Sequence, residues 1–162
     1  MESQKKVRYL VQSAVIASVY VVLTYAVHLF GLDSGVIQIR ISEALAALLF
    51  FTPAAVPGMV LGCLLSNFLV GGLLPDIIFG SLATLIGAWA GYALRKYKYA
   101  VLIPNVISNT LIIPFVLKYI YAFEGSLFYF MITVGIGEII SCAILGAVLL
   151  RVLQKHSKVI FK

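Results

Sequence analysis

Long apolar runs constrain the fold of this chain more than any motif does. The first extends from Val7 to Phe30, and comparable runs fill most of the remaining sequence. A helix needs about 20 residues to cross the hydrocarbon core of a bilayer, so this length allows about five or six crossings with short loops. Hydrophobic residues make up 62% of the chain and charged residues 11%, whereas soluble domains average about 45–50% and 25%. The sequence therefore predicts one all-α integral membrane domain over residues 1–162, with no separate soluble domain.

Turn residues divide the chain into six predicted helices. Gly31 and Asp33 mark the end of the first. The helices are predicted over residues of about 5–30, 42–51, 54–70, 76–96, 99–121 and 126–155. The second is too short to cross a bilayer without tilt or thinning. Before it, Ile37, Ile39 and Ile41 alternate with polar residues, a pattern that indicates an extended outer loop rather than a helix.

The basic residues indicate how the helices are oriented, because most of them fall into three clusters. The clusters are Lys5, Lys6 and Arg8; Arg95, Lys96 and Lys98; and Arg151, Lys155, Lys158 and Lys162. With six crossings, all three lie on one side, which the positive-inside rule assigns to the cytoplasm. Both termini are therefore predicted to be cytoplasmic, and the net charge of +6 is interpreted as topology rather than nucleic-acid binding. The first apolar run is too long for a signal peptide and is predicted to remain as a helix.

Three carboxylates lie inside or at the rim of the apolar segments, although the chain has only six acidic residues. An ionisable group at membrane depth costs about 2.5 to 3.5 kcal/mol on insertion scales, so it indicates a functional site. At compatible depths, these carboxylates and two asparagines are predicted to converge on an outward-facing pocket below the loop. The predicted substrate-binding residues are Glu138, Glu43, Asp76, Asn67, Asn109, Arg40 and Gln38, with His28 as a further candidate above the pocket.

Four of these residues also have a purely structural interpretation. Glu43 and Asp76 lie near helix starts, where the helix dipole favours acidic side chains by a few tenths to about 1 kcal/mol. Asn67 and Asn109 could form hydrogen bonds between helices. Glu138 lies in the middle of a helix, where the dipole offers no such explanation, so it is the strongest candidate for ligand recognition.

Small residues at three places predict that another helix, a backbone segment or a ligand approaches the helix closely. Gly135 and Gly137 allow a ligand or a neighbouring backbone to come near, and Gly87 and Gly91 form a small-residue motif. The first helix carries a flat strip of small residues, which is either internal packing or a docking face for another membrane subunit. The predicted docking residues are Ser13, Ala14, Ala17 and Ser18.

Several motifs are absent from the sequence. It contains no GxxxxGKS or GxxxxGKT, so the chain is not predicted to bind ATP through a P-loop, and it contains no HExxH. His28 and His156 fall at opposite ends of the predicted bundle. Cys63 and Cys142 lie in apolar segments without a second ligand at metal spacing and are predicted to pack as small apolar side chains. The sequence therefore predicts no metal, no cofactor and no enzyme activity.

Several blocks of the chain resemble a known family. RISEAL and LPDIIFGSLATL lie in the run from Gln38 to Lys96, NVISNTLIIPFVLKY begins at Asn105, and VGIGEII follows Thr133. Together they resemble the QueT family, the substrate-binding S components of energy-coupling factor (ECF) transporters. The resemblance implies a six-helix bundle with an outer pocket capped by the loop after the first helix. It also implies a membrane coupling subunit and two ATPases as partners, and a queuosine precursor as ligand: 7-aminomethyl- or 7-cyano-7-deazaguanine, or queuine.

The candidate residues suit a ligand of this kind. A guanine-like edge presents N–H donors beside a carbonyl acceptor, so a carboxylate can accept from the donors while an amide or an arginine serves the carbonyl. The lack of several inward cations argues against phosphate-bearing substrates. The alternative is a self-sufficient proton-coupled carrier or channel in which Glu138 relays protons. Against it, the chain has no second repeat half of the kind many secondary transporters contain.

Overall fold

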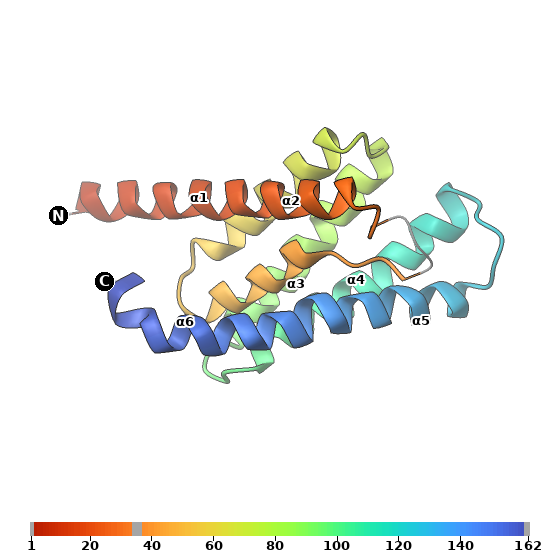
Figure 1. The fold of residues 1–162 in the computed structure, drawn as a ribbon. Helices are drawn as coiled ribbons and strands as arrows, with labels where there is room; N and C mark the ends of the chain where they lie inside the picture. The colour runs from red at the N-terminus through yellow and green to blue at the C-terminus, as the bar shows by residue number, and fades with distance from the viewer. Residues whose placement is uncertain (1, 34–36, 161–162) are drawn as a thin grey trace.

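The regular elements that the structure describes are all helical, which confirms the predicted all-α class. The structure is a computed structural model that describes residues 2–33 and 37–160. In chain order the elements are α1 (Glu2–Leu29), the 3-10 helix η1 (Ile41–Phe50), α2 (Ala55–Leu69), the π-helix η2 (Asp76–Gly80), α3 (Ser81–Ala93), the 3-10 helix η3 (Ala100–Leu102), α4 (Ile103–Phe115), the π-helix η4 (Val116–Ile120), α5 (Leu127–Glu138), the π-helix η5 (Ile139–Leu145) and α6 (Gly146–Ile160). Several of these elements follow one another without a break and form longer continuous helices (Figure 1). η2 continues into α3, α4 continues into η4, and α5 continues through η5 into α6.

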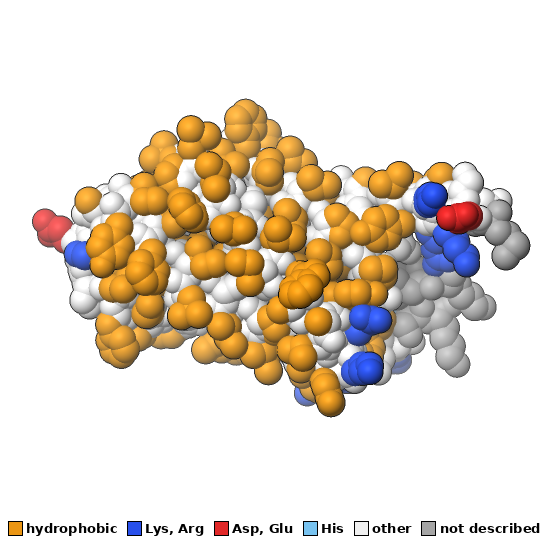
Figure 2. Space-filling model, turned by 180° about the vertical axis from the view of Figure 1, so that it is seen from behind, with side chains coloured by type: hydrophobic (Ala, Val, Ile, Leu, Met, Phe, Trp, Pro, Cys, Tyr) orange, Lys and Arg blue, Asp and Glu red, His pale blue; other side chains and the backbone are white. Residues whose placement is uncertain are grey.

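Four stretches of the described chain are long and apolar enough to cross a membrane. They are Glu2–Leu29, Asp76–Ala93, Ala100–Ile120 and Leu127–His156, and the shorter apolar helices are Ile41–Phe50 and Ala55–Leu69. Hydrophobic side chains cover most of the face shown in Figure 2, and Trp89 and Phe128 are 69% and 71% exposed. An apolar surface this extensive is suited to lipid and not to water. The protein is therefore a multi-pass protein of the cell membrane.

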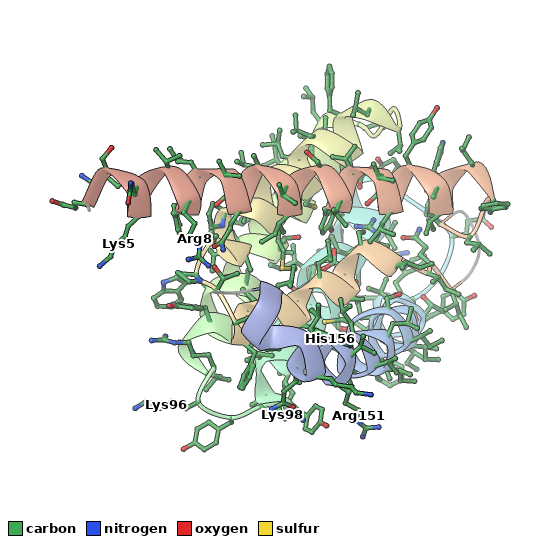
Figure 3. All side chains as sticks on the ribbon, turned by 60° about the vertical axis from the view of Figure 1, so that its left-hand side comes forward. Lys5, Arg8, Lys96, Lys98, Arg151 and His156 are labelled. Carbon is green, nitrogen blue, oxygen red and sulfur yellow. The ribbon has the colours of Figure 1, made fainter. Side chains whose placement is uncertain are left out.

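Basic side chains gather at one end of the molecule, here called the basic end. Figure 3 shows Lys5, Lys98 and Arg151 there, and both described ends of the chain lie at this end in Figure 1. The Arg151 Nε donates to the Tyr99 hydroxyl at 3.1 Å, which ties α6 to the turn before η3. Lys162, which belongs to the third predicted cluster, lies outside the described residues.

Two glycines of α2 allow α1 to pack closely against it. A Cβ at Gly58 would lie 2.8 Å from the Ile16 side chain, and one at Gly62 would lie 2.6 Å from the Tyr20 side chain. A pair of small residues four apart brings membrane helices together because it lets the two backbones approach. This pair was not among the predicted packing motifs, yet it determines where α1 lies.

The predicted docking strip on α1 is divided between the interior and the surface, and docking of a partner there stays a prediction. Ser13 and Ala17 are buried against α2, and the Ser13 hydroxyl donates to the Ala54 carbonyl at 3.2 Å. Ala14 and Ser18 are exposed. Neighbouring positions on a helix point about 100° apart, and here one pair faces α2 while the other faces outward. Ala14 and Ser18 alone remain accessible to a partner.

A packed apolar core surrounds the first turns of α2 and α6. Met59 and Leu150 are fully buried in it. Gly91 of α3 lies directly against the backbone that leads into α4, so the small-residue motif of α3 serves internal packing. Cys63 and Cys142 are free thiols within the same core.

Candidate binding cavity

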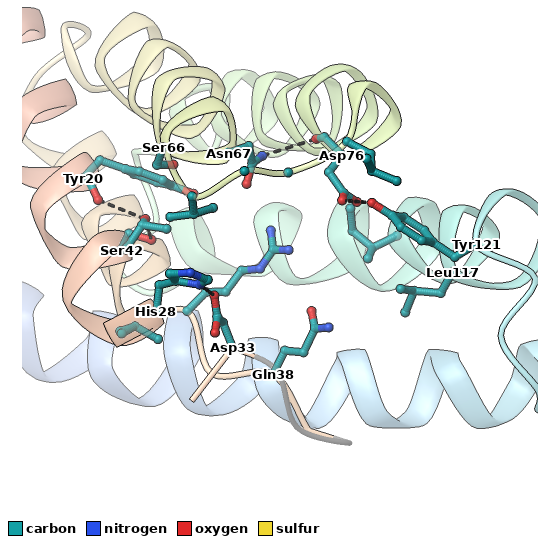
Figure 4. A pocket seen from close by; sticks show the side chains of 18 of the residues that line it. Tyr20, His28, Asp33, Gln38, Ser42, Ser66, Asn67, Asp76, Leu117 and Tyr121 are labelled. Atoms are coloured by element: carbon teal, nitrogen blue, oxygen red, sulfur yellow. Dashed lines mark hydrogen bonds and ion pairs between the residues drawn. The ribbon is translucent and has the colours of Figure 1, made fainter. Parts of the chain in front are cut away.

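A cavity of about 360 Å³ lies at the end of the bundle away from the basic end, here called the cavity end. Its walls come from the last turns of α1, the loop before η1, the turn between α2 and η2, and the segment from α4 to the turn after η4. Figure 4 shows Gln38, Asn67, Asp76 and Tyr121 around it, and Arg40 also lines it. A concave space of this size with a few convergent polar groups is typical of a small-molecule site.

One wall is formed by the turn that leads from α2 into η2. Gly71 has a φ of +78°, a value that glycine adopts without strain, and the chain reverses there toward Asp76. The Asn67 Nδ2 donates to the backbone oxygen of Asp76 at 3.2 Å. The Tyr121 hydroxyl donates to the Asp76 carboxylate. These contacts fix Asp76 from two sides, so its carboxylate is held in place before any ligand binds.

The Tyr121 phenol is a hydrogen-bond donor at ordinary pH. It lies just beyond the apolar stretch Ala100–Ile120. Burial and the neighbouring Asp76 carboxylate raise the pKa of Tyr121 from 10.0 to about 12, because both disfavour a phenolate. A phenol that donates to one carboxylate oxygen leaves further acceptor capacity on Asp76. Asp76 can therefore accept from a ligand N–H while it remains bonded to Tyr121.

The opposite wall carries hydroxyl and imidazole groups from α1 and the segments after it. The Thr24 hydroxyl donates to Ser42 Oγ at 2.8 Å, and His28 Nδ1 lies 2.8 Å from Asp33 Oδ2. His28 was a candidate from the sequence and does line the cavity. Thr24 and Ser42 were not predicted, because a hydroxyl within an apolar segment gives no signal in hydropathy.

The loop before η1 is fixed to α5 and η5 by two contacts. The Gln38 carbonyl oxygen lies directly against Gly137, where a side chain would collide with it. The Arg40 backbone N–H donates to Ser141 Oγ at 2.9 Å. Gly137 and Ser141 are one helical turn apart on one face. They hold Gln38 and Arg40 at the cavity wall, and the close backbone approach predicted at Gly137 is confirmed.

Glu43 lies in the interior and not on the cavity wall. It is 0% exposed and accepts hydrogen bonds from the Tyr20 hydroxyl and from Asn105 Nδ2, the latter at 2.5 Å. It therefore links η1 to α1 and α4. Asn105 was not predicted from the sequence, although it is a polar residue in an otherwise apolar segment, which is the signal that identified Asn67 and Asn109.

Glu138 and Asn109 also lie behind the main cavity, with exposed fractions of 5% and 1%. They are close enough to interact electrostatically. Even so, neither Glu138 Oε2 nor Asn109 Nδ2 has a well-formed hydrogen bond to any described residue. Glu138 borders a separate space of about 10 Å³, together with Gln38, Arg40, Ile113 and Val134.

The predicted substrate-binding residues thus divide into two groups. Those that line the main cavity are Gln38, Arg40, Asn67 and Asp76. Those that lie in the interior beside it are Glu43, Asn109 and Glu138. Tyr20 and Tyr121 line the cavity as well, although tyrosines in a membrane chain are usually interface or packing residues.

Metal-binding side chains do not cluster in the part of the chain that the structure describes. No group of three or more His, Cys, Asp or Glu side chains there could hold a metal ion. The cavity wall combines carboxylate, amide, guanidinium and phenol groups. Such a wall can bind a polar planar molecule through direct hydrogen bonds.

Comparison with known proteins assigns the chain to a family. The model of the QueT transporter family matches residues 10–155. The chain is also 38% identical over 77 residues to the queuosine precursor transporter QueT of Lactococcus lactis subsp. cremoris (strain MG1363). That match covers 48% of this chain and 45% of the relative, so the chain spans less than half of the relative's length. No solved structure matches the chain significantly.

Proposed function

The chain belongs to the QueT transporter family, and we propose that it is the substrate-binding membrane subunit of an ATP-driven ECF importer for a queuosine precursor. The proposed ligand is a 7-deazaguanine: the 7-aminomethyl or 7-cyano base, or queuine. The family consists of transporters and not of enzymes. Because the sequence contains no P-loop motif, ATP hydrolysis is assigned to two separate ATPase subunits.

One observation carries the proposal of a binding subunit. The cavity of about 360 Å³ presents Asp76 and Asn67 on one wall and Gln38 and Arg40 on another. A guanine-like edge needs a carboxylate for its ring N–H and amine, and an amide or guanidinium for its carbonyl. Asp76 is the proposed acceptor of the base N–H groups, and Arg40 or Gln38 the proposed donor to the carbonyl.

Calorimetry on the purified chain in detergent tests this function. The ligands are 7-aminomethyl-7-deazaguanine, 7-cyano-7-deazaguanine, queuine and guanine, in the absence of ATP. We expect one ligand per chain. The Asp76→Asn variant should lower affinity about tenfold or more, since a charged hydrogen bond contributes about 1.5–3 kcal/mol. Glu124→Gln is the control, because Glu124 is an exposed carboxylate outside the cavity. Absence of binding by the unaltered chain would contradict the function.

Docking to the membrane coupling subunit is proposed at Ala14 and Ser18, the exposed part of the small-residue strip on α1. Small side chains permit close helix approach in lipid. Replacing both residues by leucine should abolish ATP-dependent uptake by the full transporter and leave ligand affinity unchanged. Val15→Leu is the control, since Val15 is also exposed but is larger than the strip residues. Uptake at the normal rate would remove this face from the interface.

A six-crossing topology with the basic end in the cytoplasm is also proposed. The positive-inside rule supports it, because cationic side chains gather at the end where both described chain ends lie. Single cysteines at Lys98 and Glu124 should react with a membrane-impermeant maleimide from opposite sides of the membrane. The natural Cys63 and Cys142 are buried and give little background. Labelling of both positions from one side would refute the topology.

A second candidate is a proton-coupled carrier that needs no partner subunits. The buried Glu138 carboxylate, with one oxygen lacking a partner among the described residues, favours it. Proteoliposomes containing this chain alone distinguish the two functions. Uptake driven by a proton gradient supports the carrier, whereas binding without flux supports the importer subunit.

A further inference from the structure

The space beside Glu138 adjoins the main cavity. Gln38, Arg40 and Ile113 line both, so these three side chains form the partition between them. The inner space measures about 10 Å³. That is close to the volume that one water molecule requires, so a single small polar group fits.

The inner space contains an acceptor without a partner. Glu138 is almost fully buried, and its Oε2 receives no well-formed hydrogen bond from the described residues, although the Asn109 side chain lies near this carboxyl group. Val134 and Ile113 supply apolar walls. A buried carboxylate oxygen without a well-formed hydrogen bond is strongly favoured to accept one from any donor that reaches it.

The local charge favours a cation. Glu43 and Glu138 both interact electrostatically with Arg40, and Glu43 is already bonded to Tyr20 and Asn105. Arg40 forms no ion pair with a carboxylate of the described residues. Arg40 also lines the main cavity, where its guanidinium can donate to a ligand. Glu138 lines the inner space, and a cation placed there would favour its ionised carboxylate form.

We propose that the inner space is a subsite for a primary ammonium group of the ligand, with Glu138 as its acceptor and Arg40 and Gln38 as the side chains between which the group passes. This inference rests on the proposed function. A base in the main cavity would direct its 7-substituent through the partition, so that a methylene lies between the side chains and the ammonium beside Glu138. The subsite then selects 7-aminomethyl-7-deazaguanine.

The competing substituent is disfavoured for a physical reason. A cyano group is neutral, and its nitrogen is an acceptor only, so beside Glu138 it would place two acceptors together. The site would therefore reject the cyano base, because two buried acceptors would face each other without a donor. Such an unmatched pair is an effective source of specificity. Unsubstituted 7-deazaguanine leaves the inner space unchanged and reports affinity for the base alone.

The first test measures dissociation constants of three ligands with the full chain and with Glu138→Gln. The ligands are 7-aminomethyl-, 7-cyano- and unsubstituted 7-deazaguanine. The unaltered chain should bind the aminomethyl base at least about tenfold more tightly than the other two. Glu138→Gln should remove that preference and change affinity for the unsubstituted base by less than about twofold. Retained binding of the unsubstituted base shows that the variant is folded, and Glu124→Gln is the matched control at an exposed carboxylate.

A second variant tests the space without changing any charge. Val134→Ile adds one methylene to the wall of the inner space. It should reduce affinity for the aminomethyl base and spare the unsubstituted one. The subsite is overturned if the unaltered chain shows no preference for the aminomethyl base, or if Glu138→Gln weakens all three ligands equally. Failure of the unaltered chain to bind any of the three contradicts the proposed function itself, and the subsite with it.

Discussion

The basic end and the cavity end of the bundle are built differently. Near the basic end, apolar side chains such as Met59 and Leu150 are fully buried, and glycines bring the helices into direct contact. At the cavity end, polar side chains from α1, α2, the loop before η1 and the turn after η4 surround a space of about 360 Å³. Close packing stabilises a fold but leaves no room for a ligand. The comparison leads us to expect that the packed half contributes most of the stability and that the proposed ligand binding involves the other half.

The helices change geometry at the polar residues of the cavity side. η2 begins at Asp76, η4 ends directly before Tyr121, and η5 begins directly after Glu138. A π-helical segment widens the turn and alters the direction of the side chains around it, and such segments are frequent at functional sites. Pro114 lies two residues before the start of η4 and removes one backbone N–H donor from the helix. The π-helical segments thus begin or end at or directly beside Asp76, Tyr121 and Glu138, whose side chains border the main cavity or the inner space.

The largest expected effect is a loss of stability caused by a substitution in the apolar core near the basic end. Met59→Ala removes a fully buried side chain from the core and should lower the free energy of unfolding by about 2–5 kcal/mol. Affinity for the ligand should stay within about twofold. Thermal unfolding in detergent and calorimetry measure the two quantities. Met131→Ala, at a partly exposed position, is the control. A parallel loss of affinity would show that the two halves are coupled.

A substitution at Glu43 tests whether the buried hydrogen-bond network links the packed core to the cavity. Glu43→Gln replaces one carboxylate oxygen by an amide donor, which then faces either the Tyr20 hydroxyl or the Asn105 amide. Loss of a charge-assisted buried hydrogen bond should cost about 1.5–3 kcal/mol of stability. Affinity should fall as well, because Tyr20 also lines the cavity. If thermal unfolding is unchanged, the network does not link the two regions.

The contact between Gly137 and the loop before η1 tests whether the position of this loop matters for ligand binding. Gly137→Ala forces a methyl group against the Gln38 carbonyl, so the loop must move and affinity should fall about tenfold. Gly135→Ala is the matched control, since its Cβ would meet only the Thr110 side chain at 3.3 Å. Calorimetry of both variants measures the effect. Equal affinities would mean that the loop position is not needed for binding.

A smaller effect is expected at Tyr121. Tyr121→Phe removes the donor to Asp76 and should change affinity by about two- to tenfold, with the exposed Tyr119→Phe as control. Burial and Asp76 raise the Tyr121 pKa from 10.0 to about 12. A raised pKa means that the contribution is complete below pH 10.0 and is lost as the pH rises through about 12. Affinity of the unaltered chain should therefore not depend on this phenol between about pH 7 and 9.

The smallest effect is expected at the exposed edge of the basic end. Arg151→Ala removes the hydrogen bond to the Tyr99 hydroxyl. Exposed charge contacts contribute little to stability, so neither thermal unfolding nor ligand affinity should change measurably. The orientation of the chain in the membrane should also persist, because Lys155 remains in the same cluster. A clear loss of affinity would mean that the basic end influences the cavity directly.

The sequence by itself determined the all-α membrane class and showed which polar residues interrupt the apolar segments. Apolar runs and turn residues are local signals, so the all-α membrane fold follows from them. Charge clusters likewise predict which chain segments lie at one end. Asn67 and Asp76 were identified because a polar residue in an apolar segment is visible in the sequence, and both line the cavity.

The tertiary structure alone decided where each side chain points. Successive helix positions differ by about 100°, and only the neighbouring helices determine which direction faces a cavity, a partner or lipid. Glu43 is bonded to Tyr20 and Asn105 in the interior, and Glu138 borders a separate inner space. Ser13 is buried beside α2 while the adjacent Ala14 is exposed. Hydropathy is nearly the same for either orientation of a membrane helix, so packing contacts between distant segments make the choice.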